Sequence, residues 1–536
     1  MSIPAADEIQ PTLRREQGEL ANPIGANYTS WRKAIPLGHW MVVPVLLLAF
    51  FVRTQQISTV SVQWDESFCR KMVGFPWGEM FYRIILDTHP PLYYILLKIW
   101  ATVFGNGIIA GRVLSAIFGV SGVLAMYLFV RAAYRRDNKS IKEDFLEADL
   151  PAVVAAMIMA VVPIQIIWSQ QIRMYSLATA LTLWSSYLLV RALRSRDDRA
   201  AIWIAYTIVA TMLAYTHYYG LFALGAQYVY ALGYRWSLGR VGVIDRVSPV
   251  MLSACGLSLA FQPWLPYFLE QRDRVDQCFH LARPSWELLG TTMHELWIGY
   301  DVPIVASTGL MLSQGFFVAL LILLFGRRPA DYLVFLSVAI PVIIAFALSM
   351  GTRSIISSRY FQINQVFLMV AMAVVACRIP SVGRFMAISL LWWGLFSPFQ
   401  AHYAWRENAA QLAGIQAVAT RLDQEQPNQT VLVCDPLLYT CVLSYTIEKD
   451  RFYLFKPPHG FVFFQGTAVI REEEYVDTEW IDETSRRSLW TVDWAGRNQQ
   501  LPLNRQWKLD QEELYLEWYG SLKLRKYVRN KQVSSD

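Results

Sequence analysis

Two adjacent carboxylates, Asp65 and Glu66, follow the first strongly hydrophobic segment of the chain, beside the aromatic side chain of Trp64. A carboxylate close to apolar surroundings is energetically costly unless it is paired, hydrated or functional. An aspartate in such a place can act as a general base that takes a proton from an attacking hydroxyl group. The alternative is a hydrated acidic pair at the end of a helix. The pair is the first candidate for catalytic chemistry.

A second polar segment, His89-Pro90-Pro91-Leu92, lies in the same region of the chain. Proline fits the first turn of a helix and interrupts a preceding one, so the segment predicts the end of one helix and the start of the next. Helix punctuation is sufficient for the two prolines. For His89 there are two candidate roles, orientation of a carboxylate and contact with a substrate.

Two short polar turns, at 169–175 and 216–220, separate hydrophobic segments. Arg173 lies at a predicted membrane boundary, where it would contact lipid headgroups, a phosphate or a carboxylate. Tyrosines are common in interfacial belts, which is a sufficient explanation for Tyr175 and Tyr218. His217 is the less usual residue. We treat Tyr175, His217 and Tyr218 as candidates for substrate contact.

A third polar loop carries Arg353 and the pair Arg359-Tyr360, with several serines between the arginines. Two arginines this close together suit a phosphate, which offers several acceptor oxygens. The alternative is again contact with lipid headgroups. Arg173, Arg353, Arg359 and Tyr360 are therefore the candidates for phosphate binding.

The elements that carry these residues are mostly hydrophobic. The chain has 536 residues, of which 54% are hydrophobic and 17% are charged. Such a composition indicates a polytopic membrane protein with membrane lipids as neighbours. The net charge of +6 is modest, and no dense basic run or motif indicates nucleic acid binding. Residues 1–36 are expected to be a cytoplasmic tail rather than a cleavable signal peptide, because the apolar stretch starts late and no small-residue cleavage site follows it.

Eleven apolar segments are candidates for membrane-spanning helices. The fifth and sixth are the least clearly divided, because only the turn at 216–220 separates them. The segments comprise residues 37–54, 108–130, 151–168, 174–192, 201–216, 219–234, 248–268, 304–325, 331–350, 361–377 and 382–399.

Orientation follows from the loops between these segments. Lysine and arginine are concentrated after the second, fourth, sixth, eighth and tenth segments, whereas the alternate loops hold far fewer. Positively charged loops face the cytoplasm. The N-terminus is then predicted inside and the C-terminal tail outside, and all the candidate site residues fall on the outer side.

Three outer segments are long. The first, at 55–107, includes an aromatic-rich helix at 91–100 that ends before Gly105 and is expected to lie along the membrane interface. The second, at 269–303, suits another interfacial helix. The third is the tail, with helices near 406–424 and 436–447 and strands near 431–434, 452–455, 488–492 and 514–527. This tail is large enough for a core of its own.

The expected fold class is therefore a polytopic α-helical membrane protein with a small C-terminal extracytoplasmic α/β domain. The predicted parts are a cytoplasmic tail at 1–36, a transmembrane domain at 37–400 and the extracytoplasmic domain at 401–536. Cys434 and Cys441 in the tail could pair outside the cytosol. The cysteines form no CxxC motif, so no zinc or thioredoxin-like site is predicted.

Several motifs together resemble one family. The acidic pair Asp65-Glu66, the downstream His89-Pro90-Pro91-Leu92, Phe104-Gly105 before the second span and the Ser-Gln-x-x-Arg-x-Tyr turn at 169–175 resemble the dolichyl-phosphate-mannose protein mannosyltransferases. The C-terminal α/β domain is similar in kind to that of bacterial relatives and of the aminoarabinose transferases. These families belong to the GT-C superfamily of membrane glycosyltransferases, and the resemblance covers about 37–400.

The resemblance implies an inverting transfer of a sugar from a polyprenyl-phosphate donor to an acceptor hydroxyl at the outer face of the membrane. Asp65 would correspond to the catalytic acidic residue, with Glu66 beside it and the arginines holding the phosphate. No cofactor is required; some relatives use a divalent cation, and Glu66 or His89 could bind one. The chain has no insertion the size of the β-trefoil domains of eukaryotic relatives, so the acceptor is left open among glycan, lipid and protein.

A polytopic transporter or flippase for a lipid-linked or anionic substrate is the alternative. Transporters commonly contain broken helices and paired halves, and their charged residues lie at several depths. The sequence indicates neither feature and gathers its unusual charges at one face. The preferred hypothesis is a glycosyltransferase in a bacterial inner or plasma membrane.

Overall fold

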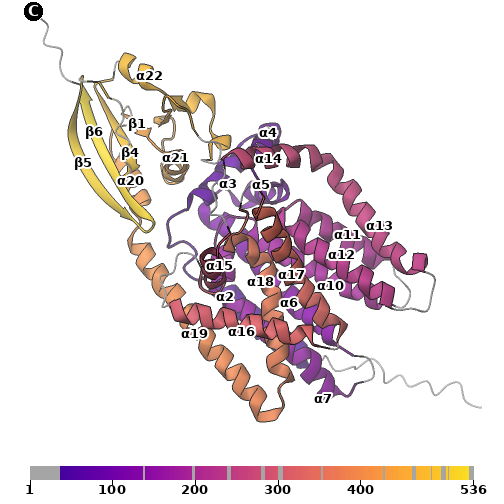
Figure 1. The fold of residues 1–536 in the computed structure, drawn as a ribbon. Helices are drawn as coiled ribbons and strands as arrows, with labels where there is room; N and C mark the ends of the chain where they lie inside the picture. The colour runs from indigo at the N-terminus through magenta and orange to yellow at the C-terminus, as the bar shows by residue number, and fades with distance from the viewer. Residues whose placement is uncertain are drawn as a thin grey trace, which may run out of the picture.

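The structure is a computed structural model. It describes residues 37–136, 139–195, 200–237, 243–278, 284–299, 306–326, 328–351, 354–426, 429–461, 466–484, 486–496, 503–504 and 506–529. A bundle of helices forms the larger part, and a six-stranded sheet with its own helices lies at one end of it (Figure 1). The architecture predicted from the sequence, apolar helices followed by a small α/β domain, is confirmed.

Each predicted span coincides with helical structure. The corresponding helices are α2 (Leu37–Thr54), α6 (Ile108–Tyr134), α8 (Leu150–Val161) with α9 (Pro163–Ser169), α10 (Tyr175–Arg194), α11 (Ala200–Ala214), α12 (Tyr219–Ser237), α13 (Val243–Phe261), α16 (Ala306–Leu324), α17 (Pro329–Ser349), α18 (Ser358–Arg378) and α19 (Ser381–Gln411). Among the described residues, five of these helices are long and apolar enough to cross a membrane, or six if the bent pair of α8 and α9 is one span. The chain is thus an integral membrane protein, but the predicted number of eleven spans is not confirmed.

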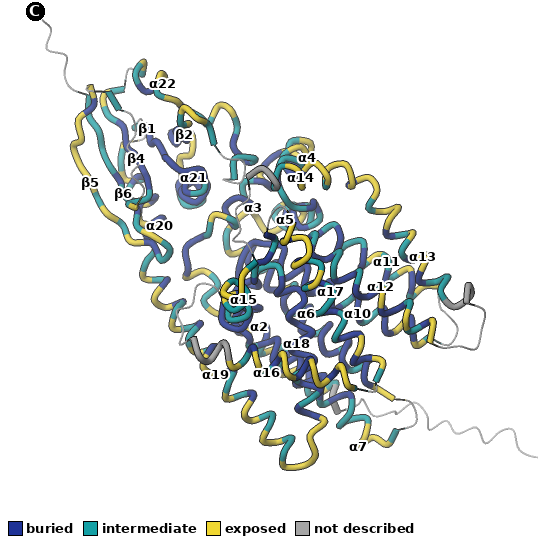
Figure 2. Tube along the Cα trace, viewed as in Figure 1, coloured by how far each residue is buried: buried dark blue, intermediate teal, exposed yellow. Residues whose placement is uncertain are grey.

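Helix length explains part of this difference. Helix α11 has 15 residues. At 1.5 Å per residue it is about 22 Å long, shorter than a hydrocarbon core of about 30 Å. Burial separates the helices further: 83% of the most apolar stretch of α18 is buried inside the protein, but only 17% of that of α19. Helices α6, α10 and α18 form the middle of the bundle, and α19 lies at its outside (Figure 2).

The long outer segments also contain helices. The first is folded into α3 (Trp64–Gly74), α4 (Trp77–Leu86) and α5 (Leu92–Phe104), and α5 ends at Gly105 as predicted, where φ is 82°. The region after α13 holds a short 3-10 turn η2 (Gln262–Trp264), α14 (Leu265–Cys278) and α15 (Trp286–Ile298). Helices α3, α4 and α5 lie at the end of the bundle that meets the sheet, while α7 (Ile141–Asp144) and the π-helical turn η1 (Phe145–Asp149) belong to the connection before α8 (Figure 1).

The C-terminal domain is built on a sheet with the strand order β3-β2-β1-β4-β6-β5. Its strands are β1 (Thr430–Val433), β2 (Phe452–Phe455), β3 (Tyr475–Val476), β4 (Ser488–Trp494), β5 (Trp507–Glu517) and β6 (Gly520–Arg529). The first four are mutually parallel, and β6 and β5 are added in antiparallel order. The prediction of a single strand near 514–527 is therefore wrong. This range covers the end of β5, the hairpin turn and most of β6.

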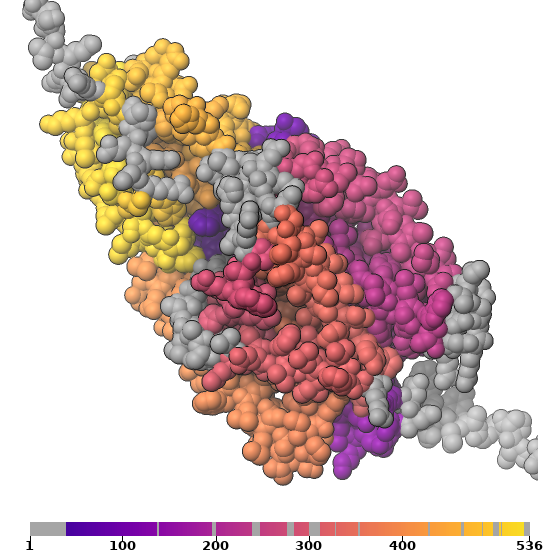
Figure 3. All heavy atoms as spheres, in the orientation of Figure 1, coloured from indigo at the N-terminus to yellow at the C-terminus, as the bar shows by residue number. Residues whose placement is uncertain are grey.

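The helices of this domain pack against the sheet and against the bundle. They are α20 (Gly414–Asp423), α21 (Pro436–Leu443) and α22 (Thr478–Glu483), with short 3-10 turns η4 (Thr467–Val469) and η5 (Glu472–Glu474). Helix α19 runs without a break past residue 400, where the predicted domain boundary lies. Helix α21 packs on α3, so the C-terminal domain (yellow in Figure 3) abuts the first outer segment.

The suggested disulfide is absent from the structure. Cys434 and Cys441 are both buried free thiols. Cys441 lies on α21, and its Sγ is 3.4 Å from the Ser67 hydroxyl of α3, in the contact between the two domains. Cys434 follows the buried strand β1, where its neighbours belong to the core of the sheet domain.

Candidate active site

Glu66 is fixed inside the protein. Its carboxylate accepts two hydrogen bonds from Arg112 of α6, Nε to Oε1 at 2.8 Å and Nη2 to Oε2 at 2.7 Å. The backbone N–H groups of Ile172 and Gln63 donate to the same carboxylate, each at 3.1 Å. Both charged side chains are almost completely buried. Each Glu66 oxygen accepts two hydrogen bonds, so Glu66 links the start of α3 to α6 and to the turn before α10.

Asp65, which directly precedes Glu66 on α3, occupies a different environment. Its oxygens lie 3.7 Å from Arg173 Nη2 and 3.9 Å from Arg359 Nη1, and 26% of its side chain is exposed. Charge-assisted hydrogen bonds normally have lengths of about 2.7–2.9 Å. Asp65 therefore faces two cations at distances longer than a charge-assisted hydrogen bond, so neither arginine is locked onto the carboxylate.

Arg173 is held by the turn between α9 and α10. The Ile172 N–H is anchored on Glu66, and Ile172 packs against Gly111 of α6, where an added Cβ would lie only 2.7 Å from the Ile172 side chain. Arg173 itself is buried, and its Nη1 lies 3.5 Å from the Cys69 thiol. The Arg173 Nε has no hydrogen-bond acceptor among the described residues. The turn thus holds the Arg173 guanidinium rigidly and leaves its Nε–H available as a hydrogen-bond donor.

A break between α8 and α9 gives this turn its direction. The two helices are bent by 62°, because Pro163 has no N–H to donate to Met159 and Val162 is extended. The freed carbonyls of Met159 and Ala160 accept hydrogen bonds from Arg53, both at 2.9 Å, and Arg53 Nε reaches Ser169 Oγ at 3.2 Å. Contrary to the sequence prediction, the chain does contain a broken helix. The break is capped by Arg53, which accounts for a buried cation at the end of α2.

His89 belongs to a small polar group with Asp87 and Tyr94. Its Nδ1 lies 3.3 Å from Asp87 Oδ2, and the Tyr94 hydroxyl donates to the same oxygen at 2.8 Å. Burial by itself raises the pKa of Asp87. His89, Arg173 and the Tyr94 hydrogen bond outweigh it, so the pKa of Asp87 lies below its ordinary value of 3.8. Asp87 is thus a second buried anion on the Arg173 side of the site.

His217 connects the two halves of the site through its ring. The ring centroid lies 5.5 Å from those of Tyr175 and Tyr360 and 6.1 Å from that of His89. Burial, His89 and Arg173 lower the pKa of His217 well below its ordinary value of 6.5, so the imidazole is neutral. Nδ1 accepts a hydrogen bond from the Tyr219 N–H at 3.2 Å, which assigns the remaining proton to Nε2.

That Nε2 proton is unused by the protein. Nε2 is buried and has no hydrogen-bond partner among the described residues. An unsatisfied buried donor is destabilising by about 1–3 kcal/mol. A ligand oxygen is the partner that such a donor lacks.

The other predicted residues fall into two groups. Arg359 and Tyr360 begin α18 and join the site, whereas Tyr218 points elsewhere: its hydroxyl bonds Gln271 of α14 and accepts from Trp264 Nε1 at 3.0 Å. Arg353 lies outside the described residues. The structure thus brings together Asp65, Arg173, Arg359, Tyr360, Tyr175, His217 and His89, but not Tyr218.

Two residues of the site were not singled out in the sequence. Arg112, the partner of Glu66, stands as a lone arginine near the start of a predicted span, and that position was its only signal. Asp87 lies two residues before His89, in the same polar segment. Among the described residues, no three His, Cys, Asp or Glu side chains are grouped so that they could hold a metal ion.

Comparison with known proteins gives a match through structure only. No family model matches the sequence, and no curated protein matches it. The fold matches ArnT from Cupriavidus metallidurans in the apo state with a TM-score of 0.61 and 13% identity, over 91% of this chain and 98% of that chain. ArnT bound to undecaprenyl phosphate gives 0.60 and 11%, over 93% and 100%.

A weaker likeness is found with the archaeal oligosaccharyltransferase AglB from Archaeoglobus fulgidus, in complex with an inhibitory peptide and a dolichol-phosphate. The TM-score is 0.48 and the identity 10%, over 85% of this chain and 69% of that chain. The resemblance to GT-C glycosyltransferases predicted from the sequence is confirmed at the level of the fold, through the match to ArnT over nearly the whole of both chains.

Proposed function

We propose that this membrane protein is an inverting glycosyltransferase that moves a sugar from a polyprenyl-phosphate donor to an acceptor hydroxyl. The observation that carries the proposal is the position of Asp65, whose oxygens form long ion pairs with Arg173 at 3.7 Å and Arg359 at 3.9 Å, neither of hydrogen-bond length. A carboxylate base and cations for a phosphate are the two groups that this reaction requires. The fold shared with ArnT, one structure of which is bound to undecaprenyl phosphate, supports the donor class.

The arginines would hold the donor phosphate. Arg173 is rigid and buried, whereas 43% of the Arg359 side chain is exposed, so Arg359 can adjust when the donor enters. Arginine matches phosphate oxygens with a planar set of donors. The arginines then stabilise the negative charge that develops on the leaving phosphate. Tyr360, next to Arg359, and Arg353, earlier in the same loop, are proposed as further phosphate contacts.

Asp65 would act on the acceptor. The acceptor oxygen attacks the anomeric carbon, the bond from that carbon to the phosphate oxygen breaks, and the hydroxyl proton passes to Asp65. The polyprenyl phosphate leaves with the bonding electron pair. Because attack and departure occur on opposite faces of the sugar, the configuration inverts. The phosphate leaves without a strong general acid, since it is already a stable anion.

The remaining side chains have supporting roles in this scheme. Glu66 fixes the start of α3, and so the direction of Asp65, through its two bonds to Arg112. The Nε2 proton of His217 is available to a sugar or phosphate oxygen, and Tyr175 supplies an apolar ring face beside it. His89 completes the polar wall next to Asp87.

A transporter or flippase is not favoured. The broken helix, which would suit a transporter, is capped internally by Arg53 and serves to position the Arg173 turn. The unpaired hydrogen-bonding capacity of the site is concentrated at Arg173 Nε and His217 Nε2, in neighbouring outer turns. These donors suit a fixed binding site at one face.

The location follows from the same scheme. We place the N-terminus in the cytoplasm and the C-terminal domain outside a bacterial inner or plasma membrane, with acceptor and donor meeting at the outer face. The acceptor is a glycan, a lipid or a protein that offers a hydroxyl. We expect transfer to continue in the presence of a metal chelator, because the arginines supply the positive charge that a divalent cation would otherwise provide.

The experiment is incubation of the purified protein in lipid nanodiscs with a panel of polyprenyl-phosphate sugars and candidate acceptors, followed by mass spectrometry. We expect one donor to be consumed with release of polyprenyl phosphate, and Asp65→Asn to abolish this. Near-normal transfer by Asp65→Asn refutes the base assignment. If the wild-type protein moves the intact lipid-linked sugar across vesicles without cleaving it, the proposed reaction is wrong.

A further inference from the structure

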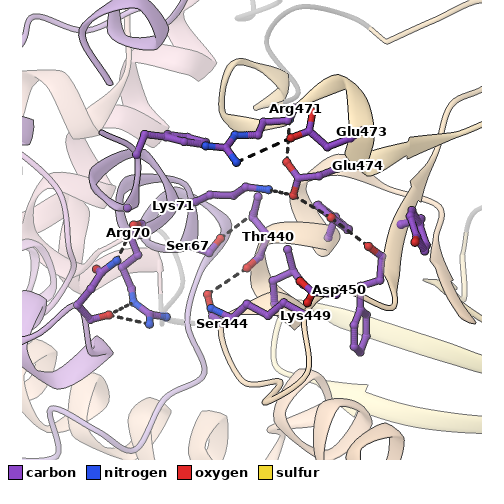
Figure 4. Close-up of a pocket in the computed structure, with 17 residues that line it drawn as sticks. Ser67, Arg70, Lys71, Thr440, Ser444, Lys449, Asp450, Arg471, Glu473 and Glu474 are labelled. Atoms are coloured by element: carbon purple, nitrogen blue, oxygen red, sulfur yellow. Dashed lines mark hydrogen bonds and ion pairs between the residues drawn. The ribbon is translucent and has the colours of Figure 1, made fainter. Parts of the chain in front are cut away.

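A cavity of about 560 Å³ lies between α3 and the C-terminal domain (Figure 4). One wall comes from α3 through Ser67, Arg70 and Lys71, and the opposite wall comes from α21 and the segments around β2 and η5. Pockets of about 300–1,000 Å³ are of the size that binds small molecules. The cavity is therefore large enough for a ligand of a few rings.

This cavity is separate from the Asp65 site because it lies on another face of α3. Successive residues of an α-helix are about 100° apart, so Cys69 projects within about 40° of Asp65, whereas Arg70 projects about 140° away. The contacts agree: Cys69 touches Arg173 of the active site, while Arg70 and Ser67 line the cavity. Helix α3 thus carries one site on each side.

Two of the four cations that line the cavity are neutralised within the protein. Arg471 lies 3.8 Å from Glu473, which also lines the cavity, and Lys71 bonds Glu474 (Figure 4). Lys71–Glu474 and a further pair of Arg471 with Glu79, at 2.8 Å, cross from the first outer segment to the C-terminal domain and join the two walls. They leave little charge for a ligand.

The other two cations, Arg70 and Lys449, differ. Neither forms an ion pair with a carboxylate of the described residues, and Arg70 Nη1 is buried with no hydrogen-bond acceptor among them. Arg70 is oriented by two bonds to the Asn106 carbonyl, at 3.0 and 2.8 Å, which leave Nη1 to the cavity. Partial desolvation of the Lys449 ammonium group and the charge of nearby Arg70 lower the pKa of Lys449, so the two cations lie close enough to repel each other. Asp450, an exposed neighbour, offsets only part of this charge.

The rest of the lining is rich in hydroxyl groups and aromatic rings. Ser67, Thr440 and Ser444 provide hydroxyls, and Tyr439, Phe452 and Tyr453 provide rings. Hydroxyls both donate and accept hydrogen bonds, as the hydroxyls of a sugar require. Flat apolar ring faces suit the C–H faces of a sugar ring. The lining therefore suits a saccharide more than an apolar molecule.

We propose that this cavity binds an acidic saccharide, whose anionic group is held by Arg70 and Lys449. We further propose that this saccharide is the charged part of the acceptor, a statement that rests on the glycosyltransferase activity proposed above. Binding on the far side of α3 would hold an extended acceptor while its reacting hydroxyl reaches Asp65.

Binding can be tested without transfer. The full-length protein in nanodiscs is titrated with a hyaluronan tetrasaccharide, which carries carboxylates, and with fully N-acetylated chitotetraose, a neutral chain of the same length. We expect the charged chain to bind at least ~10-fold more tightly, the affinity to fall with salt, and Arg70→Gln or Lys449→Gln each to weaken it by about 10-fold. Lys508→Gln, on the exposed strand β5, is the matched control and should change nothing.

One substitution is expected to strengthen binding of the charged chain. Asp450→Asn removes the carboxylate next to Lys449 and should tighten binding of the charged chain. Because Lys449 and Asp450 are exposed, the Lys449→Gln and Asp450→Asn variants are expected to fold even if Arg70→Gln does not. Equal binding of the two tetrasaccharides, no binding of either, or weaker binding by Asp450→Asn overturns the proposal.

The proposed glycosyltransferase function and the proposed saccharide site can be refuted independently. Asp65→Asn is expected to bind the charged tetrasaccharide with unchanged affinity although it does not transfer sugar. A protein that transfers sugar but does not distinguish the two tetrasaccharides refutes the cavity proposal alone. A protein that binds the charged chain through Arg70 and Lys449 but cleaves no polyprenyl-phosphate sugar refutes the proposed function and leaves the binding site standing.

Discussion

Asp65 and Glu66 should respond in opposite ways when each loses its charge. Asp65→Asn should reduce transfer by a factor of about 10²–10⁴, the usual contribution of a general base. It should lower stability less than Glu66→Gln does, because its nearest cations are 3.7 and 3.9 Å away and the side chain is partly exposed. Fully exposed ion pairs contribute about 0–1 kcal/mol; because Arg173 is buried, the loss should exceed that range but stay below the roughly 3–5 kcal/mol of a buried, hydrogen-bonded pair.

Glu66→Gln should mainly destabilise the protein. The amide group of glutamine would direct N–H donors at the Arg112 guanidinium, where the wild-type carboxylate accepts bonds of 2.8 and 2.7 Å. Disrupting a buried ion pair costs about 3–5 kcal/mol, because the remaining charge stays buried without its partner. The Ile172 N–H, which bonds the same carboxylate, connects this loss to the turn that carries Arg173.

The assay measures both properties on the same preparations. Thermal unfolding in detergent gives the midpoint, and donor consumption at saturating acceptor gives the rate. Glu448→Gln, an exposed carboxylate of the C-terminal domain, is the control and should change neither quantity. The reasoning is refuted if Glu66→Gln keeps the wild-type midpoint but loses transfer, or if Asp65→Asn unfolds at a clearly lower temperature while its folded fraction transfers sugar normally.

Three further perturbations test other parts of the structure. Arg53→Met should lower the unfolding midpoint, because the carbonyls of Met159 and Ala160 at the helix break lose their donor. His217→Asn should keep the midpoint within a degree or two but raise KM for the donor by up to about tenfold, since the amide can replace Nδ1 as acceptor for Tyr219 but cannot reach the Nε2 position. Burial raises the pKa of Glu517 to about 7 from an ordinary 4.5, so the folded state binds more protons than the unfolded state between these values and stability falls as pH rises through them. Glu517→Gln should remove this slope. Because both carboxylate oxygens accept backbone N–H bonds, from Ile415 and Trp518, the amide loses one of these bonds, so the pH dependence and not the midpoint itself is the quantity to compare.

Each of these expectations has an outcome that contradicts it. An unchanged midpoint for Arg53→Met would mean that the break is held by other contacts. An unchanged KM for His217→Asn would mean that Nε2 does not meet the donor. If wild-type and Glu517→Gln unfold with the same pH dependence between pH 4.5 and 7, the buried carboxylate of Glu517 is not protonated there.

The fold was largely readable from the local sequence pattern. Apolar runs predicted the positions of the bundle helices, Pro91 and Gly105 marked the two ends of α5, and the pattern of the tail located β1, β2 and β4. These features depend on neighbouring residues and on burial, which sequence periodicity reports directly. The pattern of the tail did not find β3, and it merged β5 and β6 into one strand. The number of spans could not be derived in the same way, because helix length and burial among neighbours depend on packing.

The acid and arginine content of the site was also readable, because charges in outer turns stand out against an apolar background. Asp65, Arg173 and Arg359 were chosen for that reason, and they lie together. Tyr218 was a candidate for substrate contact beside the less usual His217, yet its hydroxyl bonds Gln271 of α14 and Trp264. Neighbouring residues in a tight turn diverge in direction, and composition does not say which one faces inward.

The acidic pair shows what the sequence alone determined and what depended on the tertiary structure. The sequence placed two carboxylates at the start of one outer helix. The family resemblance pointed to Asp65, but the residues themselves did not distinguish the two roles, because adjacent residues on a helix have the same local context and differ only by about 100° in direction. The tertiary contacts of α3 turned Glu66 to Arg112 of α6 in the interior and left Asp65 facing Arg173 and Arg359. The long-range contacts that made this choice join segments far apart in the chain, and no local pattern encodes them.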